Sequence, residues 1–409
     1  MGDKSEGFRA VDEGILVHDR VDLVFATPGP HSHFFGYYDN SPFDAQGRRL
    51  LCHSVEFDGR MVKAGDRAEI GLWDLTRGSY SVLAETGAFN WQQGSLLQWL
   101  PAADGSQVVF NDRAADRFVG VRVHVGQETR TLLPTTVCAL TPDGRWSVTP
   151  RFERLYYTPG YHYEGLALAQ WEGGLPAGDA LLRMDLQTGT VAPIVDVARL
   201  ARHRTTPSMA GANHYVSHIS VAPSGREMIF LHRWKGADKQ PLTRLYRCDL
   251  DGSNLRLYPD SGRYSHTTWL DGDRFLVWGR PLAAYARLRT STGMARWLLK
   301  PFLTFWRRHH KSPMLRTLAR QVNKDGYLLF AGDAKAPQVL APTVLTQDGH
   351  PSACPASGEW LLLDTYPDQE NLQHLLLYHL ESGRLFEIAR VYAPPAFQAT
   401  GFRCDLHPR

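Results

Sequence analysis

The stretch VAPSGREMIFLHRW (221–234) combines a short apolar run, a Ser-Gly turn and a second apolar run. An apolar run that stops at a glycine-containing turn and then resumes is typical of two antiparallel strands joined by a hairpin. Six units of this kind occur along the chain, which predicts a repeat architecture. The other five are SPFDAQGRRLLCHS (41–54), LPAADGSQVVFND (100–112), LTPDGRWSVTP (140–150), WLDGDRFLVWG (269–279) and CPASGEWLLLDTYPD (354–368).

A second pattern follows most of these units and adds two more strands to each. A strand ends, usually at Asp-Leu, a turn follows, and another strand begins. Two hairpins in series make a four-stranded antiparallel unit, which buries both faces only when it stacks against its neighbours. The clearest copies are LWDLTRGSYSVL (72–83), LRMDLQTGTVAPI (182–194), YRCDLDGSNLRLY (246–258) and LYHLESGRLFEI (377–388).

These units predict an all-β fold, a seven-bladed β-propeller that forms a single domain over residues 1–409. A seventh unit begins with GFRCDLHPR (401–409) and stops, so we expect an incomplete last blade. The run GILVHDRVDLVFA (14–26) is expected to supply one outer strand of that blade. Two blades carry insertions, a loop at 151–213 and a basic, partly helical segment at 280–339.

Composition describes a soluble globular protein, with 43 % apolar and 21 % charged residues. The polar N-terminus shows no signal peptide, and no run of 18 apolar residues predicts a membrane span. Five cysteines, an odd number spread along the chain, argue against a disulfide framework and for a reducing compartment. These observations predict a cytoplasmic protein.

The net charge of +3 conceals one strongly basic segment. Residues 274–324 hold 12 Lys or Arg and no Asp or Glu, which leaves 33 basic against 42 acidic residues elsewhere. Within it, MARWLLKPFLTFWRRHH (294–310) suggests an amphipathic helix. The segment is either a cap packed on the propeller with a solvated basic face, or a peripheral contact for an anionic membrane or polymer. No feature predicts a nucleic-acid partner.

Histidines concentrate where the innermost strand of each predicted blade begins. Of 17 histidines, several lie in HFFGYYD (33–39), NHYVSHIS (213–220), YSHTTW (264–269), DGHPSACP (348–355) and FRCDLHPR (402–409). If radial symmetry gathers them at the channel, they bind a transition metal; otherwise they are hydrogen-bonded histidines capping strand ends. The predicted ligands are His218, His266, His350, His407 and the Cys404 thiolate, with the Asp405 carboxylate as a further possibility.

A second cluster of chemistry-bearing residues lies in RFERLYYTPGYHYEG (151–165). Arginine pairs bidentately with carboxylates, and tyrosine offers a stacking face and a phenolic proton, which together suit an acidic sugar. The alternative is an aromatic loop packed on the blade. The candidate substrate-binding residues are Arg113, Arg151, Tyr163 and Tyr38, and the candidate catalytic residues are Tyr157, Tyr161, Arg154, His214 and His232.

The motifs GYYDNSPFD, FNDR, RFERLYYTPGYHYEG, SHTTW, DGHPS and RCDLHPR, in this order, resemble those of propeller polysaccharide lyases. Oligogalacturonate lyases and ulvan lyases, built on TolB-like repeats, are the relatives concerned. The resemblance implies β-elimination at a uronic acid, with Arg154 or a metal neutralising the carboxylate. It also implies a divalent metal (Mn, Zn or Ca) held by inner-strand histidines, matching His266, His350 and His407.

The leading hypothesis is therefore a lyase acting on a uronate-containing oligo- or polysaccharide, with an acidic oligosaccharide as its partner. The alternative is a non-catalytic propeller that binds a glycan, an anionic surface or a partner protein. A hydrolase with paired carboxylates is a third possibility, since Asp112, Glu153 and Glu164 are available.

Overall fold

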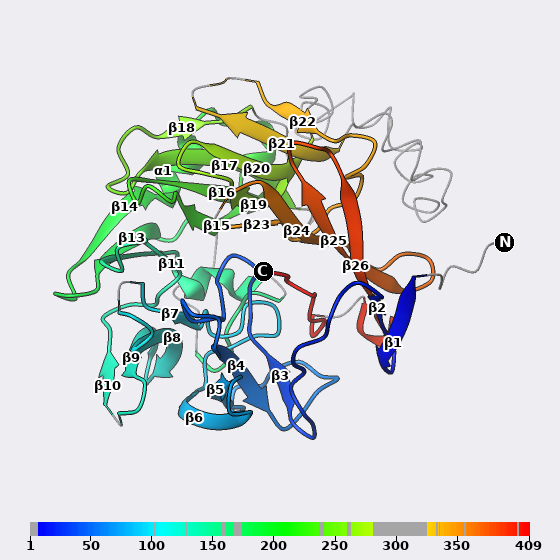
Figure 1. Cartoon of the computed structure of the whole chain (residues 1–409). Coiled ribbons are helices and arrows are strands. Elements are labelled where there is room, and N and C mark those ends of the chain that lie inside the picture. Colours follow the sequence, from blue (N-terminus) through cyan, green and yellow to red (C-terminus); the bar gives the residue numbers. More distant parts are fainter. Residues whose placement is uncertain are drawn as a thin grey trace. The chain divides into compact units, whose positions relative to one another are not determined.

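The computed structural model describes residues 7–280 and 325–409, apart from 102, 128, 158–159, 167–173, 237–240, 260–262, 333, 335, 356 and 399–400. The predicted helix at 294–310 lies outside the described residues. The described strands form six antiparallel sheets and are accompanied by very little helix (Figure 1). The protein is an all-β, six-bladed β-propeller.

The first five sheets take their strands in chain order, as the repeat predicts. The first holds β3 (Ser32–Phe34), β4 (Arg49–Val55), β5 (Ala68–Asp74) and β6 (Ser79–Thr86); the second holds β7 (Gln98–Trp99), β8 (Gln107–Ala114), β9 (Arg117–His124) and β10 (Arg130–Leu132). The third holds β11 (Ala139–Leu140), β12 (Trp146–Thr149), β13 (Ala180–Asp185) and β14 (Val191–Asp196).

The fourth and fifth sheets follow the same order, and the sixth also takes up the two N-terminal strands. The fourth holds β15 (Asn213–Val221), β16 (Glu227–Lys235), β17 (Pro241–Asp249) and β18 (Arg256–Leu257); the fifth holds β19 (Tyr264–Trp269), β20 (Arg274–Gly279), β21 (Gly326–Ala331) and β22 (Gln338–Leu340). The sixth holds β23 (Ser352–Ala353), β24 (Trp360–Asp364), β25 (Leu372–His379) and β26 (Leu385–Tyr392), followed by the N-terminal strands β2 (Ile15–His18) and, at the edge, β1 (Phe8–Asp12). The described helices are η1 (Phe152–Tyr157), α1 (Val197–Arg202), η3 (Pro207–Met209) and α5 (Pro395–Gln398).

Glycine recurs in the repeated turn because the backbone there has a positive φ. Gly225 adopts φ +67° and its N–H bonds the carbonyl of Ala222, which closes the turn between β15 and β16. Gly144 adopts the same φ of +67° between β11 and β12. Residues with a Cβ rarely adopt this left-handed conformation, so the turn recurs with glycine.

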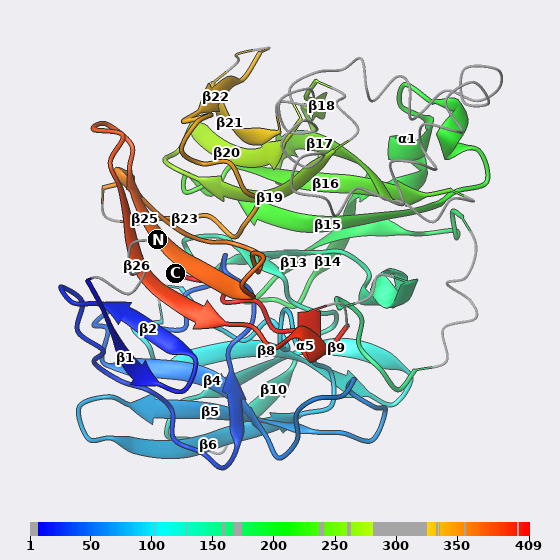
Figure 2. The ribbon, with the colours of Figure 1, turned by 90° about the vertical axis from the view of Figure 1, so that its right-hand side faces the viewer.

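The prediction of a seventh, incomplete blade is wrong. The N-terminal strand β2 pairs with β26, from Ile15 opposite Val391 to Val17 opposite Ala389, and so extends the sixth sheet (Figure 2). Residues 401–409 form no strand. His407 has φ +47°, and its N–H bonds the Asp364 carboxylate, so this segment cannot join a ladder of strand hydrogen bonds.

The chain divides into two compact units. Unit 1 comprises Met1–Trp171, Leu182–Ala192 and Gly349–Arg409, and unit 2 comprises Glu172–Leu181 and Pro193–Asp348. The first, second and sixth sheets belong to unit 1, the fourth and fifth to unit 2, and the third is divided between them. Within the described residues, no helix is long and apolar enough to span a membrane.

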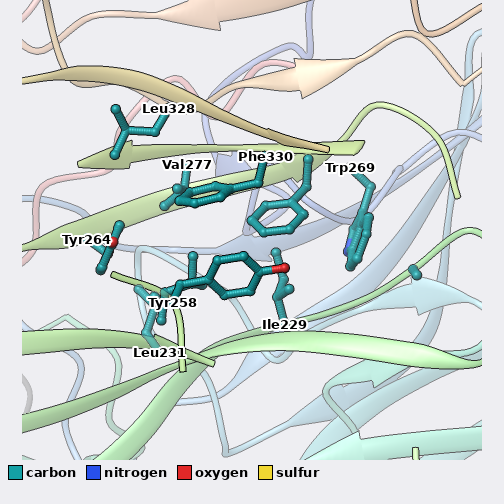
Figure 3. Close-up of a cluster of buried hydrophobic side chains, with 11 residues drawn as sticks. Ile229, Leu231, Tyr258, Tyr264, Trp269, Val277, Leu328 and Phe330 are labelled. Atoms are coloured by element: carbon teal, nitrogen blue, oxygen red, sulfur yellow. The ribbon is translucent and has the colours of Figure 1, made fainter. Parts of the chain in front are cut away.

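The fourth and fifth sheets bury an aromatic core in unit 2 (Figure 3). Phe330 is 0 % exposed, and its ring centroid lies 4.6 Å from that of Tyr258 and 5.3 Å from that of Phe275. Core side chains of this kind close the space between stacked blades, where each sheet is covered on both faces.

Replacing Phe330 by alanine should lower the free energy of unfolding by about 3–5 kcal/mol, because it removes buried apolar surface and leaves a cavity. Chemical denaturation measures the change. Val24→Ala is the control, since Val24 is 89 % exposed and its loss should alter stability by less than about 0.5 kcal/mol. Equal effects of the two substitutions would contradict this account of the core.

Candidate functional site

Unit 1 gathers three potential metal ligands, His350, Asp405 and His407, into one buried group, here called the His-Asp-His cluster. One donor atom from each lies within 4.8 Å of the others. The imidazole rings of the two histidines meet at 4.3 Å between centroids and 87° between planes. No other set of three His, Cys, Asp or Glu side chains in the described part of the chain has such an arrangement.

The Asp364 carboxylate orients His350. Asp364 ends β24 and is 2 % exposed, and its Oδ1 accepts from the backbone N–H of His350 at 2.7 Å. Both carboxylate oxygens lie 2.9 Å from His350 Nδ1. Gly349 allows this approach, because a Cβ there would lie 1.9 Å from the Asp364 carbonyl oxygen. With Nδ1–H donated to the carboxylate, Nε2 is the nitrogen with a lone pair for a cation.

His407 is oriented in the same manner by a backbone carbonyl. Its Nδ1 lies 3.0 Å from the Gly36 oxygen, and its own backbone N–H donates to Asp364 Oδ2 at 3.2 Å. Gly36 also permits a close approach, since a Cβ on it would lie 2.6 Å from the Gln93 carbonyl oxygen. Donation of Nδ1–H to a carbonyl again directs the lone pair of Nε2 away from the backbone.

The Asp405 carboxylate forms an ion pair with the Arg403 guanidinium. The carboxylate lies 2.7 Å from Arg403 Nε through Oδ1 and accepts from Nη2 at 2.9 Å through Oδ2. Burial acts to lower the pKa of Arg403, but Asp405 more than offsets this, so the pKa is above its ordinary value. A metal ion in the cluster would therefore share the Asp405 carboxylate with the Arg403 guanidinium.

This donor set fits a divalent transition metal. Two imidazole nitrogens and one carboxylate oxygen suit zinc or manganese better than calcium, which takes oxygen ligands. Both imidazoles have the outer hydrogen-bond partner that metal-binding histidines usually have. His350, Asp405 and His407 are thus the unit-1 residues that could hold the metal.

Tyrosines line the same cluster. The Tyr37 ring centroid is 5.0 Å from that of His407, and the Tyr38 centroid is 5.3 Å from that of His350. The ring centroids of Tyr37 and Tyr161 lie 6.1 Å apart, and the two side chains are hydrogen-bonded. Burial, and then the neighbouring tyrosines, raise the pKa of Tyr37 well above its usual value, so its hydroxyl stays protonated. Tyr161 is only partly buried and brings a second phenol to the cluster.

The other predicted metal ligands lie elsewhere. Cys404 does not join the His-Asp-His cluster, and loss of hydration raises the pKa of its thiol to about 12. His218 and His266 belong to unit 2, where their rings lie 5.9 Å apart. His266 Nδ1 is 3.0 Å from Asp348 Oδ1, and His218 Nδ1 is 3.0 Å from Ser217 Oγ. Of the histidines predicted as metal ligands, the structure therefore brings together one pair in each unit.

His214 and His232 lie inside unit 2. They are 1 % and 0 % exposed, and His214 Nδ1 is 3.0 Å from His232 Nε2. The indole of Trp234 stacks on His214 at 6.3 Å. Burial and the neighbouring His214 lower the pKa of His232 well below its ordinary value, so His232 is neutral at physiological pH.

The Arg and Tyr candidates of residues 113–163 have different environments. Arg113 donates to the carbonyls of Glu164 at 2.9 Å and Ala64 at 2.8 Å. Tyr163 is 1 % exposed and its hydroxyl accepts from Asn111 Nδ2 at 3.1 Å, so it packs in the core. Arg154 is 4 % exposed, Arg151 is partly buried, and the side chain of Tyr157 lies outside the described residues.

Three residues in contact with the His-Asp-His cluster were not singled out from the sequence. They are Asp364, Arg403 and Tyr37. Asp364 had one visible signal, because a carboxylate ends an apolar strand where a buried apolar residue is expected. Tyr37 had none, since the rings it contacts, those of Tyr161 and His407, are remote in the chain. The partner of Arg403, Asp405, is only two residues away, but nothing in the sequence shows that the two side chains pair.

No protein-family model matches the sequence, and no curated protein matches it. Among solved structures, an oligogalacturonate lyase from Vibrio parahaemolyticus is similar at 11 % identity and a TM-score of 0.52, over 91 % of this chain and 80 % of that one. The β-propeller domain of the Trilobed protease from Pyrococcus furiosus is similar at 10 % identity and a TM-score of 0.47, over 87 % of this chain and 86 % of that one. A putative TolB from Agrobacterium tumefaciens is similar at 12 % identity and a TM-score of 0.36, over 93 % of this chain and 87 % of that one. What the chain shares with the lyase at this identity is the β-propeller fold.

Proposed function

We propose that this protein is a lyase that cleaves a uronic-acid-containing oligo- or polysaccharide by β-elimination. The observation that carries the proposal is the His-Asp-His cluster, with two oriented imidazoles and a carboxylate beside a partly buried phenol. The oligogalacturonate lyase with a similar fold agrees with this choice of substrate class.

The reaction makes definite demands on the site. A base removes the C5 proton, the released electron pair forms the C4–C5 double bond, and the C4–oxygen bond breaks. The departing oxygen then takes a proton. A divalent ion held by His350, Asp405 and His407 would act as a Lewis acid on the C6 carboxylate and so ease removal of the C5 proton.

The chain's own residues divide the remaining tasks. Asp364 and Gly36 orient the two imidazoles, and Arg403 holds the Asp405 carboxylate in place. Tyr161, which is hydrogen-bonded to the protonated Tyr37, delivers the proton to the departing oxygen. Tyr157 stays the predicted candidate for the base, and Arg154 for carboxylate neutralisation; His214 and His232 lie in unit 2 and are assigned no role in this site.

The test is an absorbance assay on oligogalacturonides and other oligouronides with Mn²⁺, Zn²⁺ or Ca²⁺ supplied in turn. β-elimination creates an unsaturated uronide, so absorbance in the far ultraviolet should rise with uronides and stay flat with neutral oligosaccharides. Glycan binding by calorimetry without any rise in absorbance would instead identify a non-catalytic glycan-binding propeller. Metal analysis after dialysis accompanies the assay, with about one ion per chain expected from a single three-ligand site.

A further inference from the structure

Residues 8–25, here called the N-terminal strap, contact both the sixth and the first sheet of unit 1 (Figure 2). The first sheet lies within residues 32–86 and the main part of the sixth within 352–392, so the chain between them passes through all the other sheets. Bringing together segments so remote in sequence costs loop-closure entropy, which contacts between the two sheets must offset. The strap supplies such contacts.

One end of the strap is paired with the outer strand of the sixth sheet. Residues 15–17 of β2 lie opposite β26, and Val17 is buried there. The Arg390 guanidinium of β26 lies over the Phe8 ring, 4.1 Å from its centroid. Glu387 accepts two hydrogen bonds from Arg390, at 2.9 and 2.8 Å, and so fixes the guanidinium against the ring. This end is therefore held by a short ladder and a cation–π contact.

Phe25 attaches the other end of the strap to the first sheet. Its ring centroid lies 5.3 Å from that of Trp73, a buried residue of β5, and the ring packs on the hydrophobic cluster to which Trp73 belongs. The residues on either side, 22–24 and 26–31, are exposed, and Val24 is 89 % exposed. A partly buried ring in an otherwise exposed run is an anchor, because its apolar contact fixes the neighbouring backbone.

The His-Asp-His cluster is assembled across the same two sheets. On the side of the sixth sheet, the backbone N–H groups of His350 and His407 both donate to Asp364, at the end of β24. On the side of the first sheet, Gly36 follows β3 and its carbonyl oxygen lies 3.0 Å from His407 Nδ1. Separation of the two sheets would move Gly36 away from Asp364, and His407 would lose one of these two hydrogen bonds.

We propose that the N-terminal strap positions the His-Asp-His cluster, because its docking on β26 holds the sixth sheet against the first. Phe8 and Phe25 are then positioning residues, which act through the backbone that carries His350 and Gly36. Coupling between two sites is reciprocal, so a divalent ion bound in the cluster would in turn stabilise the docked strap. The part that concerns the ion rests on the proposed function, whereas the docking of the strap does not.

Hydrogen exchange of the metal-free protein, followed by mass spectrometry, tests the strap without any ion or turnover. Phe25→Ala should speed exchange about 10-fold or more in three peptides, because loss of the anchor raises the population of the opened strap. These peptides contain Val17, His350 and His407. Exchange in β8 and β9 of the second sheet should stay unchanged. Val24→Ala is the matched control, since this neighbouring side chain is exposed, and it should exchange like the wild type.

Two more variants separate docking from general destabilisation. Phe8→Ala removes the contact at the opposite end of the strap and should give the same exchange pattern. A disulfide between Val17→Cys and Ala389→Cys, which replace opposite residues of β2 and β26, should restore slow exchange at His350 and His407 in the Phe25→Ala protein. Titration with Mn²⁺ should show affinity weakened about 5-fold or more by Phe25→Ala and recovered with the disulfide.

The outcomes distinguish this proposal from the proposed function. Unchanged exchange at His350 and His407 in Phe25→Ala would overturn the positioning role of the strap, whatever the lyase assay shows. Fast exchange that the disulfide does not correct would overturn it as well. If Phe25→Ala fails to fold, Phe8→Ala decides. Faster exchange at all three peptides, in a protein that binds no divalent ion, would uphold the strap and overturn the metal site of the proposed function.

Discussion

Replacing His407 by asparagine should abolish the stoichiometric divalent-metal binding that we propose for the cluster and, under the proposed lyase function, lower turnover by about 100-fold or more. Loss of a direct ligand should cost more than the roughly 10–100-fold that loss of an outer-shell partner costs. Asparagine suits the position because it tolerates the φ of +47° found there, and its amide can still donate to Gly36 O. Metal content after dialysis and metal titration of the apo-protein measure the effect.

His374→Asn is the control for this substitution. His374 lies on β25 with Nδ1 2.5 Å from Glu387 Oε1 and Nε2 3.2 Å from Asp368 Oδ2. It is therefore an imidazole among carboxylates that does not belong to the cluster, and its replacement should leave metal content unchanged. A His407→Asn protein that keeps one ion per chain would show that the His-Asp-His cluster does not bind the metal.

Replacing Asp364 by asparagine should weaken metal binding by roughly 10–100-fold and lower the free energy of unfolding by about 1–3 kcal/mol. The carboxylate accepts three donors, the backbone N–H groups of His350 and His407 and the Nδ1–H of His350. An amide has one oxygen fewer, so it leaves a buried donor without an acceptor. It also weakens the preference of His350 for the tautomer with Nε2 unprotonated.

Metal titration and chemical denaturation measure the two effects separately. Asp74→Asn is the matched control, because Asp74 also accepts two backbone N–H groups, those of Thr76 and Arg77 at 3.0 Å, in an exposed turn. Its replacement should cost less than about 1 kcal/mol and leave metal binding unchanged. Wild-type metal affinity in Asp364→Asn would show that this carboxylate does not support the site.

The blades could be found from the sequence because their signals are local. The apolar run, glycine turn and second apolar run within residues 221–234 lie inside one hairpin, β15–β16. The same pattern marks the other five sheets. The extra blade came from applying this pattern to residues 401–409, whose first residues look like another strand start. The N-terminal run was expected to supply an outer strand of that seventh blade; instead β2 pairs with β26 and β1 forms the edge of the sixth sheet.

The histidines of the site were visible for a related reason. His350 and His407 stand where innermost strands were expected to begin, and the structure brings these two together. Their grouping with Cys404, however, does not hold in the structure. Adjacent residues of an extended segment point in opposite directions, so Asp405 can face the cluster while Cys404 does not.

By itself, the sequence determined an all-β propeller of repeated four-stranded blades and the concentration of histidines at strand starts, because both are patterns of neighbouring residues. Only the tertiary structure decided the number of blades, the carboxylate behind His350 and the carbonyl that orients His407. These depend on which distant segments meet: β2 with β26, Asp364 with His407, and Gly36 with His407. Such meetings result from the packing of whole sheets, which no short stretch of residues encodes.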